Sequence, residues 1–252
     1  MSGALVNGTD RWFAPSPARP EAVAVLLCLP YAGAGASAFH AWQRAYPKEI
    51  DLQPVQLPGR ENRIAEPHRV DPDEVADAVA GRIDRPYAIY GHSMGARLGF
   101  EVIRSLRRLG APAPARFYVG GCRPPDETEP LVRLARLPEA EFVRRLRELG
   151  GSLAEALEVP ELRELVLPTL RADFGWIDGY RYEGEAPLPM PIVGFAGDAD
   201  PAAPPDTMAG WCRHTVSGFR LCVMPGDHFF LHTRAADVAA TISADLLCWD
   251  AS

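Results

Sequence analysis

The sequence predicts an α/β protein with a mainly parallel central sheet and helices on both of its faces. Short apolar runs of strand length alternate along the chain with longer stretches whose apolar residues recur at helical spacing. Neighbouring parallel strands need a crossover segment between them. This alternation is therefore typical of a parallel sheet buried between two layers of helices.

Six segments have the apolar character of strands. They are expected at residues 22–29, 52–57, 87–90, 117–120, 191–195 and 220–224, and helices are expected at residues 72–82, 96–109 and 235–247. The last of these helices is expected to place Val238, Ile242, Leu246 and Leu247 on one face, following a period of 3.6 residues.

The stretch from about residue 128 to residue 180 interrupts the alternation, because it has helical periodicity and no strand pattern. Pro138 is expected to open one helix and Gly150 to follow its end, while a second helix should begin near Pro160. We therefore expect one domain over residues 1–252, in which residues 128–180 form a helical lid insertion.

Apolar stripes on both lid helices indicate how the insertion packs. One stripe comprises Phe142, Leu146 and Leu149, and the other comprises Leu162, Leu165, Val166, Leu170, Phe174 and Ile177. Pro168 interrupts the longer stripe and should kink or divide its helix. Gly150 and Gly151 are expected to form a hinge, since glycine tolerates large backbone changes.

Composition and charge limit the classes of partner. The 252 residues are 47% hydrophobic and 23% charged, as is ordinary for a globular protein. The net charge of −7 argues against nucleic acid as the main partner, because phosphate binding needs a basic surface. A local basic cluster could steer an acidic partner or form a solvated helix face. It consists of Arg133, Arg136, Arg144, Arg145 and Arg147, with Glu139, Glu141 and Glu148 as counter-charges.

The N-terminal segment has no basic stretch followed by an apolar one, so no signal peptide is expected. Residues 22–29 form its longest apolar run, which is far shorter than the roughly 20 residues of a membrane span. Five scattered cysteines without a CxxC pair fit reduced thiols better than a disulfide framework or a zinc site. We expect a cytoplasmic monomer that does not bind a membrane.

The most specific motif is Gly91-His92-Ser93-Met94-Gly95, which fits the G-x-S-x-G pattern of a nucleophile elbow. A strand precedes it and a helix follows, which is the context that this motif needs. The glycines allow a tight turn that lifts the serine hydroxyl to the carboxyl edge of the sheet. We therefore expect an α/β-hydrolase fold with Ser93 as nucleophile and the N–H of Met94 as one oxyanion donor.

A nucleophilic serine needs a base, and the base needs an acid that orients it. In this fold the acid and then the histidine follow the serine along the chain. His228 stands in the loop after the strand at 220–224, where the base must lie. By contrast, His214 precedes that strand, and His232 falls in or beside the next helix.

The acid is expected in the loop that follows the strand at 191–195. Asp200 lies three residues past Gly197 and is followed by Pro201, which would fix the loop. Asp198 competes with Asp200, and would otherwise cap the loop or be solvated.

The second oxyanion donor should come from the loop after the first long strand, Leu29-Pro30-Tyr31-Ala32-Gly33-Ala34-Gly35. Its small residues let the backbone approach a substrate. The loop does not complete a dinucleotide fingerprint, because Ala38 stands where G-x-G-x-x-G requires its third glycine.

Further motifs lie along the chain between about residues 22 and 247. They are Pro30-Tyr31-Ala32-Gly33, Leu57-Pro58-Gly59-Arg60-Glu61 with Arg63, Gly197 to Pro201, Gly226 with His228-Phe229-Phe230-Leu231, and, in the lid, Leu167-Pro168 with Arg171-Ala172-Asp173-Phe174. Together with the elbow, these motifs resemble those of the type II thioesterases of polyketide and nonribosomal peptide biosynthesis.

The resemblance implies an editing hydrolase that removes unwanted acyl groups from the phosphopantetheine thiol of acyl or peptidyl carrier proteins. It implies that Ser93, Asp200 and His228 form the triad and that the N–H groups of Ala32 and Met94 form the oxyanion hole. Contacts with the acyl substrate are assigned to Tyr31, Leu170, Phe174 and Phe229. Such serine chemistry requires no metal or organic cofactor.

Two other kinds of function fit part of the pattern. A general carboxylesterase, or a thioesterase domain cut from a synthase, would share the fold. Comparing acyl-pantetheine thioesters with simple oxygen esters would separate these enzymes. A catalytically inactive α/β-hydrolase that binds a ligand would lack a member of the triad, whereas all three residue types are present here.

Overall fold

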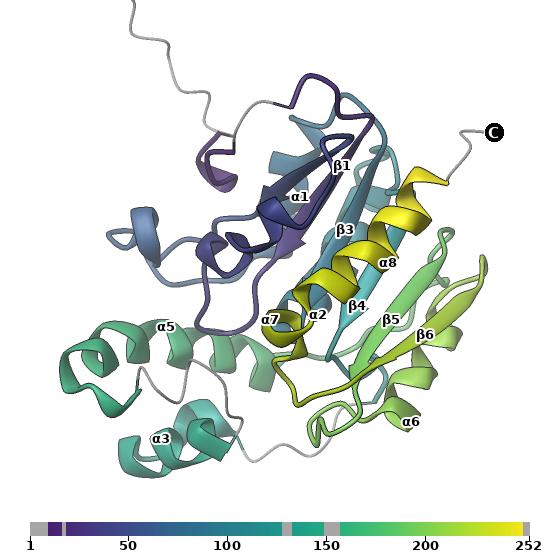
Figure 1. Ribbon diagram of the computed structural model, residues 1–252. Coiled ribbons are helices and arrows are strands. Elements are labelled where there is room, and N and C mark those ends of the chain that lie inside the picture. Colours follow the sequence, from purple (N-terminus) through teal and green to yellow (C-terminus); the bar gives the residue numbers. More distant parts are fainter. Residues whose placement is uncertain (1–9, 17–18, 128–132, 149–156, 249–252) are drawn as a thin grey trace, which may run out of the picture.

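A six-stranded sheet, in which every neighbouring pair of strands is parallel, forms the centre of the molecule (Figure 1). The computed structural model describes residues 10–16, 19–127, 133–148 and 157–248. The strands are β1 (Ala24–Leu29), β2 (Ile50–Pro54), β3 (Tyr87–His92), β4 (Arg116–Gly120), β5 (Ile192–Gly197) and β6 (Phe219–Met224). Their order across the sheet is β2-β1-β3-β4-β5-β6. The predicted parallel sheet is confirmed.

Burial of the strands follows from their place in the sheet. Every residue of β1 and of β3 is buried, because these central strands are covered on both faces. In β6, at the edge, only Met224 is buried. The uninterrupted apolar runs in the sequence therefore mark the middle of the sheet.

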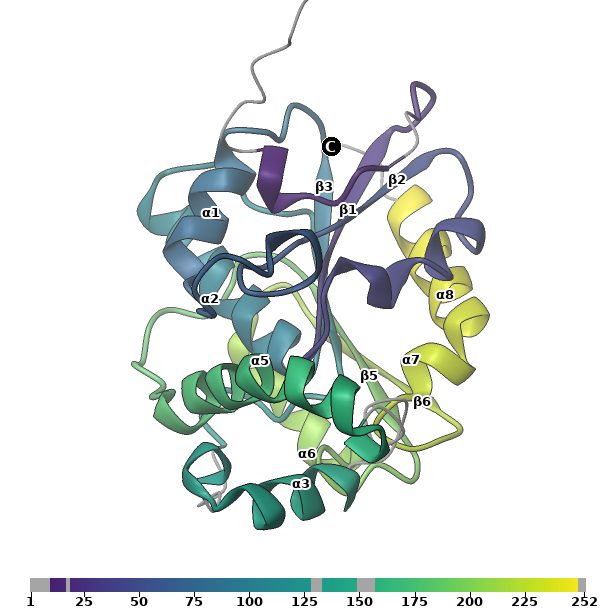
Figure 2. The same ribbon diagram turned by 90° about the vertical axis from the view of Figure 1, so that its left-hand side faces the viewer.

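Helices form a layer on each face of the sheet (Figure 2). The α-helices are α1 (Pro72–Ala80), α2 (Met94–Arg108), α3 (Glu139–Glu148), α5 (Pro160–Gly179), α6 (Pro205–Met208), α7 (Phe230–Thr233) and α8 (Ala235–Leu247). Short 3₁₀ helices are η1 (Asp10–Trp12), η2 (Ala36–Phe39), η3 (Trp42–Arg44), η4 (Glu61–Arg63), η5 (Leu134–Arg136) and η6 (Ala209–His214). In the described ranges, no helix combines the length and the apolar character needed to cross a membrane.

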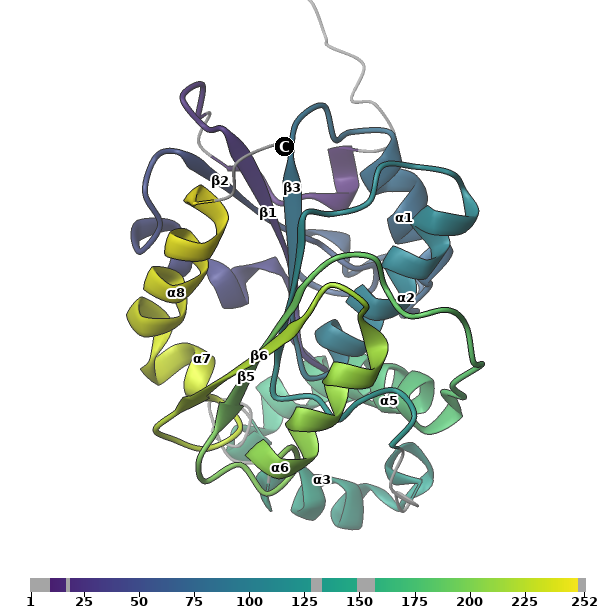
Figure 3. The ribbon, with the colours of Figure 1, turned by 90° about the vertical axis from the view of Figure 1, so that its right-hand side faces the viewer.

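Each helical layer has its own apolar core. On one face, Val102 of α2 belongs to the same buried cluster as Ile89 of β3. On the other face, Val238 and Ile242 of α8 share a cluster with Tyr90 of β3. Figure 3 shows α7 leading into α8 on that second face. The expected apolar face of the last helix is confirmed for Val238, Ile242 and Leu246, whereas Leu247, at the end of α8, is 40% exposed.

The helices α3 and α5 come between β4 and β5 and lie across one end of the sheet, at the bottom of Figure 2. They are the two helices expected in the insertion at 128–180. Residues 128–132 and 149–156, which include the expected hinge at Gly150 and Gly151, lie outside the described residues. Pro168 stands inside α5 and does not divide it, since α5 runs unbroken from Pro160 to Gly179.

The buried face of α5 differs from the predicted stripe. Leu170 is fully buried, but Leu162 and Leu165 are 45% and 54% exposed. Leu167 and Asp173 are buried in their place. Apolar residues are so frequent along α5 that more than one side of the helix could pack against the rest of the protein. The face that turns inward is the one that contacts the loops after β1 and β2, as described below.

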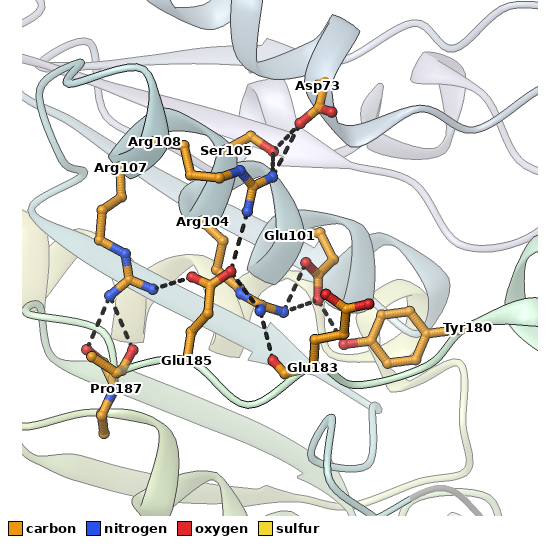
Figure 4. Close-up of polar contacts among 11 residues, drawn as sticks. Asp73, Glu101, Arg104, Ser105, Arg107, Arg108, Tyr180, Glu183, Glu185 and Pro187 are labelled. Carbon is orange, nitrogen blue, oxygen red and sulfur yellow. Dashed lines mark hydrogen bonds and ion pairs between the residues drawn. The ribbon is translucent and has the colours of Figure 1, made fainter.

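A buried arginine ties α2 to the segment that follows α5 (Figure 4). The Arg104 side chain is 4% exposed and forms ion pairs with Glu101 at 2.8 Å and with Glu185 at 2.7 Å. It also donates a hydrogen bond to the Glu183 carbonyl at 2.7 Å. Tyr180, the residue that follows α5, donates to Glu101 at 2.6 Å. The chain leaving the insertion is thereby fixed to the core.

Candidate active site

Ser93 occupies the sharp turn between β3 and α2. Its φ of 52° lies in the left-handed region, which residues other than glycine rarely adopt. Its N–H donates to the Gly120 carbonyl at 2.8 Å. A Cβ at Gly91 would lie 2.2 Å from the Gly95 carbonyl oxygen, and a Cβ at Gly95 would lie 2.2 Å from the Leu29 carbonyl oxygen. The turn thus has the close backbone approach of a nucleophile elbow, which explains both flanking glycines.

His228 and Asp200 form a buried pair. His228 Nδ1 lies 2.8 Å from Asp200 Oδ2, and the side chains are 8% and 0% exposed. Asp200 Oδ1 accepts hydrogen bonds from the N–H groups of Ala202 at 2.8 Å and Ala203 at 3.2 Å. Burial alone would raise the pKa of the Asp200 carboxyl. The bonds from His228 and from the two N–H groups outweigh burial and hold that pKa below its usual value.

The ionised state of Asp200 fixes the tautomer of His228. A carboxylate can only accept hydrogen bonds, so Nδ1 of His228 must carry the proton that lies between the two groups. The other ring nitrogen, Nε2, is then left with a lone pair. His228 can therefore take up a proton at Nε2.

The other candidates for the acid and the base form hydrogen bonds with other groups. Asp198 is exposed, and its Oδ1 accepts the Gly226 N–H at 2.9 Å. His214 Nε2 lies 2.8 Å from Asp126 Oδ1. His232 Nε2 lies 3.0 Å from the Tyr31 hydroxyl. These contacts hold loops and helix ends in place, and His228 is the histidine that the fold pairs with Asp200.

A second buried histidine, His92, contacts the backbone of His228. Its Nε2 lies 2.8 Å from the His228 carbonyl oxygen, and its Nδ1 lies 3.2 Å from the Tyr90 hydroxyl. Burial lowers the pKa of His92 to about 3, so the ring is neutral at ordinary pH. Nε2–H therefore donates to His228, and Nδ1 accepts from Tyr90. The place of His92 between Gly91 and Ser93 is the sequence signal that could have revealed this contact.

A cavity of about 670 Å³ opens beside Ser93. Ser93, His228, Ala32 and Met94 all line it, so the candidate nucleophile, the candidate base and the two residues proposed as amide donors border one space. Met94 is the first residue of α2, and its N–H has no acceptor within the helix. The positive end of the helix dipole therefore points at the place where negative charge would develop.

The insertion supplies much of the remaining wall. From α5 and the segments beside it, the lining residues are Arg133, Leu134, Phe174, Ile177, Asp178, Tyr180 and Arg181. Arg97 and Arg123 also line the cavity, so arginines outnumber carboxylates around it. Within the described part of the chain, no group of three or more His, Cys, Asp or Glu side chains is arranged to hold a metal ion.

Of the four side chains expected to contact the acyl group, Phe174 lines the cavity. Leu170 is instead fully buried against Gly33, and Tyr31 packs edge to face on Phe229 at a ring separation of 5.2 Å. These three are not among the described residues that line the cavity. Leu170 packs on the turn at Gly33, and Phe229 packs on Tyr31, so these side chains contact the loop after β1.

The family is decided by comparison with known proteins. Residues 24–246 match the family model described as a thioesterase domain. The chain belongs to the thioesterase family. Its enzyme class is accordingly a hydrolase that acts on thioester bonds.

Relatives cover almost the whole thioesterase. Gramicidin S biosynthesis protein GrsT of Aneurinibacillus migulanus is 36% identical over 90% of this chain and 91% of its own. Linear gramicidin dehydrogenase LgrE of Brevibacillus parabrevis is 37% identical over 94% of this chain and 93% of its own. The solved structure of YbtT, a type II thioesterase from the yersiniabactin NRPS/PKS biosynthetic pathway, is 30% identical over 92% of this chain and 96% of its own, with a TM-score of 0.79. The resemblance to type II thioesterases and the α/β-hydrolase fold are thus confirmed.

LgrE is named as a dehydrogenase, and the common dinucleotide site is marked by the glycine fingerprint G-x-G-x-x-G. In the thioesterase, Ala38 stands at the third position of the glycine fingerprint. The loop after β1 is also occupied in another way, since the Gly33 N–H donates to Asp173 of α5. The residues of this chain therefore favour hydrolysis over hydride transfer.

Proposed function

We propose that this thioesterase is an editing enzyme that hydrolyses acyl groups from the phosphopantetheine thiol of acyl or peptidyl carrier proteins. The observation that carries the proposal is that His228, paired with Asp200 at 2.8 Å, lines the same cavity as Ser93. The names of two relatives support the biosynthetic setting, because GrsT is named for gramicidin S biosynthesis and YbtT for an NRPS/PKS pathway.

Acylation is the first half of the proposed reaction. Ser93 Oγ attacks the thioester carbonyl while His228 Nε2 takes the hydroxyl proton. The N–H groups of Ala32 and Met94 stabilise the oxyanion of the tetrahedral intermediate. The C–S bond then breaks, the sulfur leaves with the proton from His228, and the acyl group stays on Ser93 as an oxygen ester. Asp200 stabilises the transient imidazolium and keeps its charge throughout.

Deacylation repeats these steps with water as the nucleophile. His228 Nε2 takes a proton from water as the oxygen attacks the acyl carbonyl. The same two N–H groups hold the second oxyanion. When the C–O bond to Ser93 breaks, His228 returns the proton to Oγ and a carboxylic acid is released. Each step uses groups of this chain and water, so we propose that no metal or organic cofactor takes part.

The cavity suits an acyl group that arrives on a pantetheine arm. Its volume of about 670 Å³ lies within the usual range of small-molecule sites. Phe174 and Ile177 of α5 provide apolar wall, and the arginines at positions 97, 123, 133 and 181 provide positive charge for an anionic arm. In this proposal α3 and α5 act as the lid that builds the acyl pocket. The triad and both amides come from one chain, so we infer that a monomer is active.

Intact-mass analysis tests this function directly. Carrier proteins bearing acetyl, hexanoyl or aminoacyl pantetheine are incubated with the enzyme, and loss of the acyl mass is followed with time. We expect the wild type to strip the carriers and Ser93→Ala to leave them loaded. A matched oxygen ester of each acyl group is the control for the carboxylesterase alternative. Faster hydrolysis of the free oxygen esters than of the carrier-bound thioesters would contradict the proposal.

A further inference from the structure

The loop that carries Ala32 contains a tight turn. The orientation of the central peptide group of this turn depends on a hydrogen bond from outside the loop. The Ala34 N–H donates to the Tyr31 carbonyl at 3.1 Å, and Gly33, at the third position of this turn, has a φ of +81°. That value is typical of a type II turn. Type I and type II turns differ in the orientation of their central peptide group, here the one between Ala32 and Gly33. Whatever binds the Gly33 N–H therefore fixes the orientation of that group, which is joined through the Cα of Ala32 to the peptide group that carries the Ala32 N–H.

Asp173 of α5 binds this N–H. Its Oδ2 accepts the hydrogen bond from Gly33 at 2.7 Å. Arg60 binds the same carboxylate through both terminal nitrogens, with Nη1 2.8 Å from Oδ2 and Nη2 2.7 Å from Oδ1. Arg60 Nη1 also donates to the Ala34 carbonyl at 2.9 Å. The side chains of Arg60 and Asp173 are 4% and 0% exposed, so one buried ion pair holds an N–H and a carbonyl of the turn.

Neighbouring contacts hold α5 against this turn and against the loop after β2. A Cβ at Gly33 would lie 2.5 Å from Leu170 Cδ2, so the side chain of Leu170 packs directly on the turn. Thr169 donates to the Gly59 carbonyl at 3.2 Å. The motifs at residues 57–61 and 171–174 have no role in the proposed reaction steps. Both contact the turn at residues 31–34 through Arg60 and Asp173.

We propose that Arg60 and Asp173 are positioning residues for the oxyanion hole, and that they make its shape depend on the seating of α5 over the cavity. This rests on the proposed function. Asp173 adjoins Phe174, which lines the cavity, so one turn of α5 both forms the acyl pocket and holds the oxyanion loop. If α5 were displaced, Gly33 would lose its acceptor and Arg60 its counter-charge. Hydrolysis is therefore fast only when α5 lies in the position that keeps Asp173 bound to Gly33 and Arg60.

Two matched double variants test this role. Arg60→Met/Asp173→Asn and Arg60→Met/Asp173→Leu both remove the buried charges, so neither leaves an arginine unpaired. They differ in whether position 173 can accept the Gly33 N–H. We measure kcat and KM for a hexanoyl N-acetylcysteamine thioester, and the Ki of a hexyl trifluoromethyl ketone, whose adduct with Ser93 places an oxyanion in the same hole.

We expect kcat of the asparagine variant to stay within about tenfold of the wild type. The leucine variant should fall about 100-fold below the asparagine variant, as when one oxyanion donor is lost. The Ki of the trifluoromethyl ketone should rise in the same proportion, while KM changes little. Arg116→Met is the control for loss of a largely buried arginine, since its partner Asp245 lies on α8 and neither residue is among those that line the cavity. It should lower Tm with kcat and Ki kept within about threefold.

Equal kcat and equal Ki in the two double variants would overturn the inference, as would a fall in kcat without a rise in Ki. Either result would leave the proposed function standing, because the wild type would still hydrolyse the thioester. Failure of the proposed function has a different signature, namely hydrolysis by Ser93→Ala at the wild-type rate.

Discussion

Replacement of Asp200 by asparagine tests the hydrogen-bond logic of the candidate site. Asp200 Oδ1 accepts two backbone N–H groups, from Ala202 and Ala203, and Oδ2 faces His228 Nδ1 at 2.8 Å. In Asp200→Asn the amide oxygen must stay on the two N–H donors, because the NH₂ group cannot accept from them. The NH₂ group then faces His228 and donates to Nδ1.

The expected cost follows from the tautomer. With Nδ1 accepting, the ring proton moves to Nε2, which is the atom that must take the proton from Ser93. Loss of the base in this way lowers kcat by about 10⁴-fold in serine enzymes. That factor corresponds to roughly 5.5 kcal/mol of transition-state free energy. The fold should be kept, because asparagine matches aspartate in shape and retains both backbone hydrogen bonds.

Release of N-acetylcysteamine from its hexanoyl thioester, followed with a thiol reagent, measures this loss. Asp198→Asn is the matched control, since Asp198 is exposed and its contact with the Gly226 N–H can be kept by an amide oxygen. We expect the control to stay within about threefold of the wild type. A large loss in Asp198→Asn with near-normal activity in Asp200→Asn would refute the assignment of the acid.

Three further expectations concern stability, the pocket and docking. The pKa of His92 is about 3 in the folded protein. The unfolded state binds more protons below about pH 6.5, and stability should fall by about 4 kcal/mol between pH 7 and pH 3. The free energy of unfolding of His92→Gln, measured with denaturant, should fall less between pH 7 and pH 3 than that of the wild type. The same pH dependence in both proteins would contradict this expectation. Phe174→Trp should shift acyl-length preference towards shorter chains, whereas Leu170→Trp should lower Tm, because Leu170 is fully buried against the loop after β1; a chain-length shift in Leu170→Trp alone would reverse these roles. If the exposed arginines of α3 steer docking, salt should lower kcat/KM for carrier-bound substrates more than for small thioesters. Arg144→Ala should reduce that difference, because it removes one of these arginines and frees Glu141 from its ion pair at 2.5 Å. Equal salt effects on both substrates would remove the docking role.

The parts of the site that lie close together in sequence could be predicted from the sequence. The elbow is specified by five neighbouring residues and by the strand and helix on either side, and Ser93 stands where that motif places it. His228 and Asp200 each follow a strand that the apolar pattern reveals. Since the carboxyl ends of parallel strands meet at one edge of a sheet, strand order alone brings these loops together.

The choice between neighbours in one loop was harder to make from sequence. Asp198 and Asp200 both fit the pattern, and the path of the loop separates them. That path leaves Asp198 exposed on the Gly226 N–H and turns Asp200 inward onto His228. The acyl contacts show the same limit, because a helical stripe places Leu170 and Phe174 on one side of α5 without saying which of them meets the cavity.

Sequence by itself predicted the class of fold, the candidate nucleophile and base, and the resemblance to thioesterases, because each depends on periodicity, turn chemistry or short motifs. Tertiary structure alone decided that Asp173 holds Gly33, 140 residues away, and that Arg60 pairs with Asp173 across 113 residues. It likewise brought His92 to the His228 carbonyl, 136 residues away. Such contacts have no local signature. A buried polar group must find a partner, but the partner is whichever segment the packing of the sheet, the loops and α5 brings within reach.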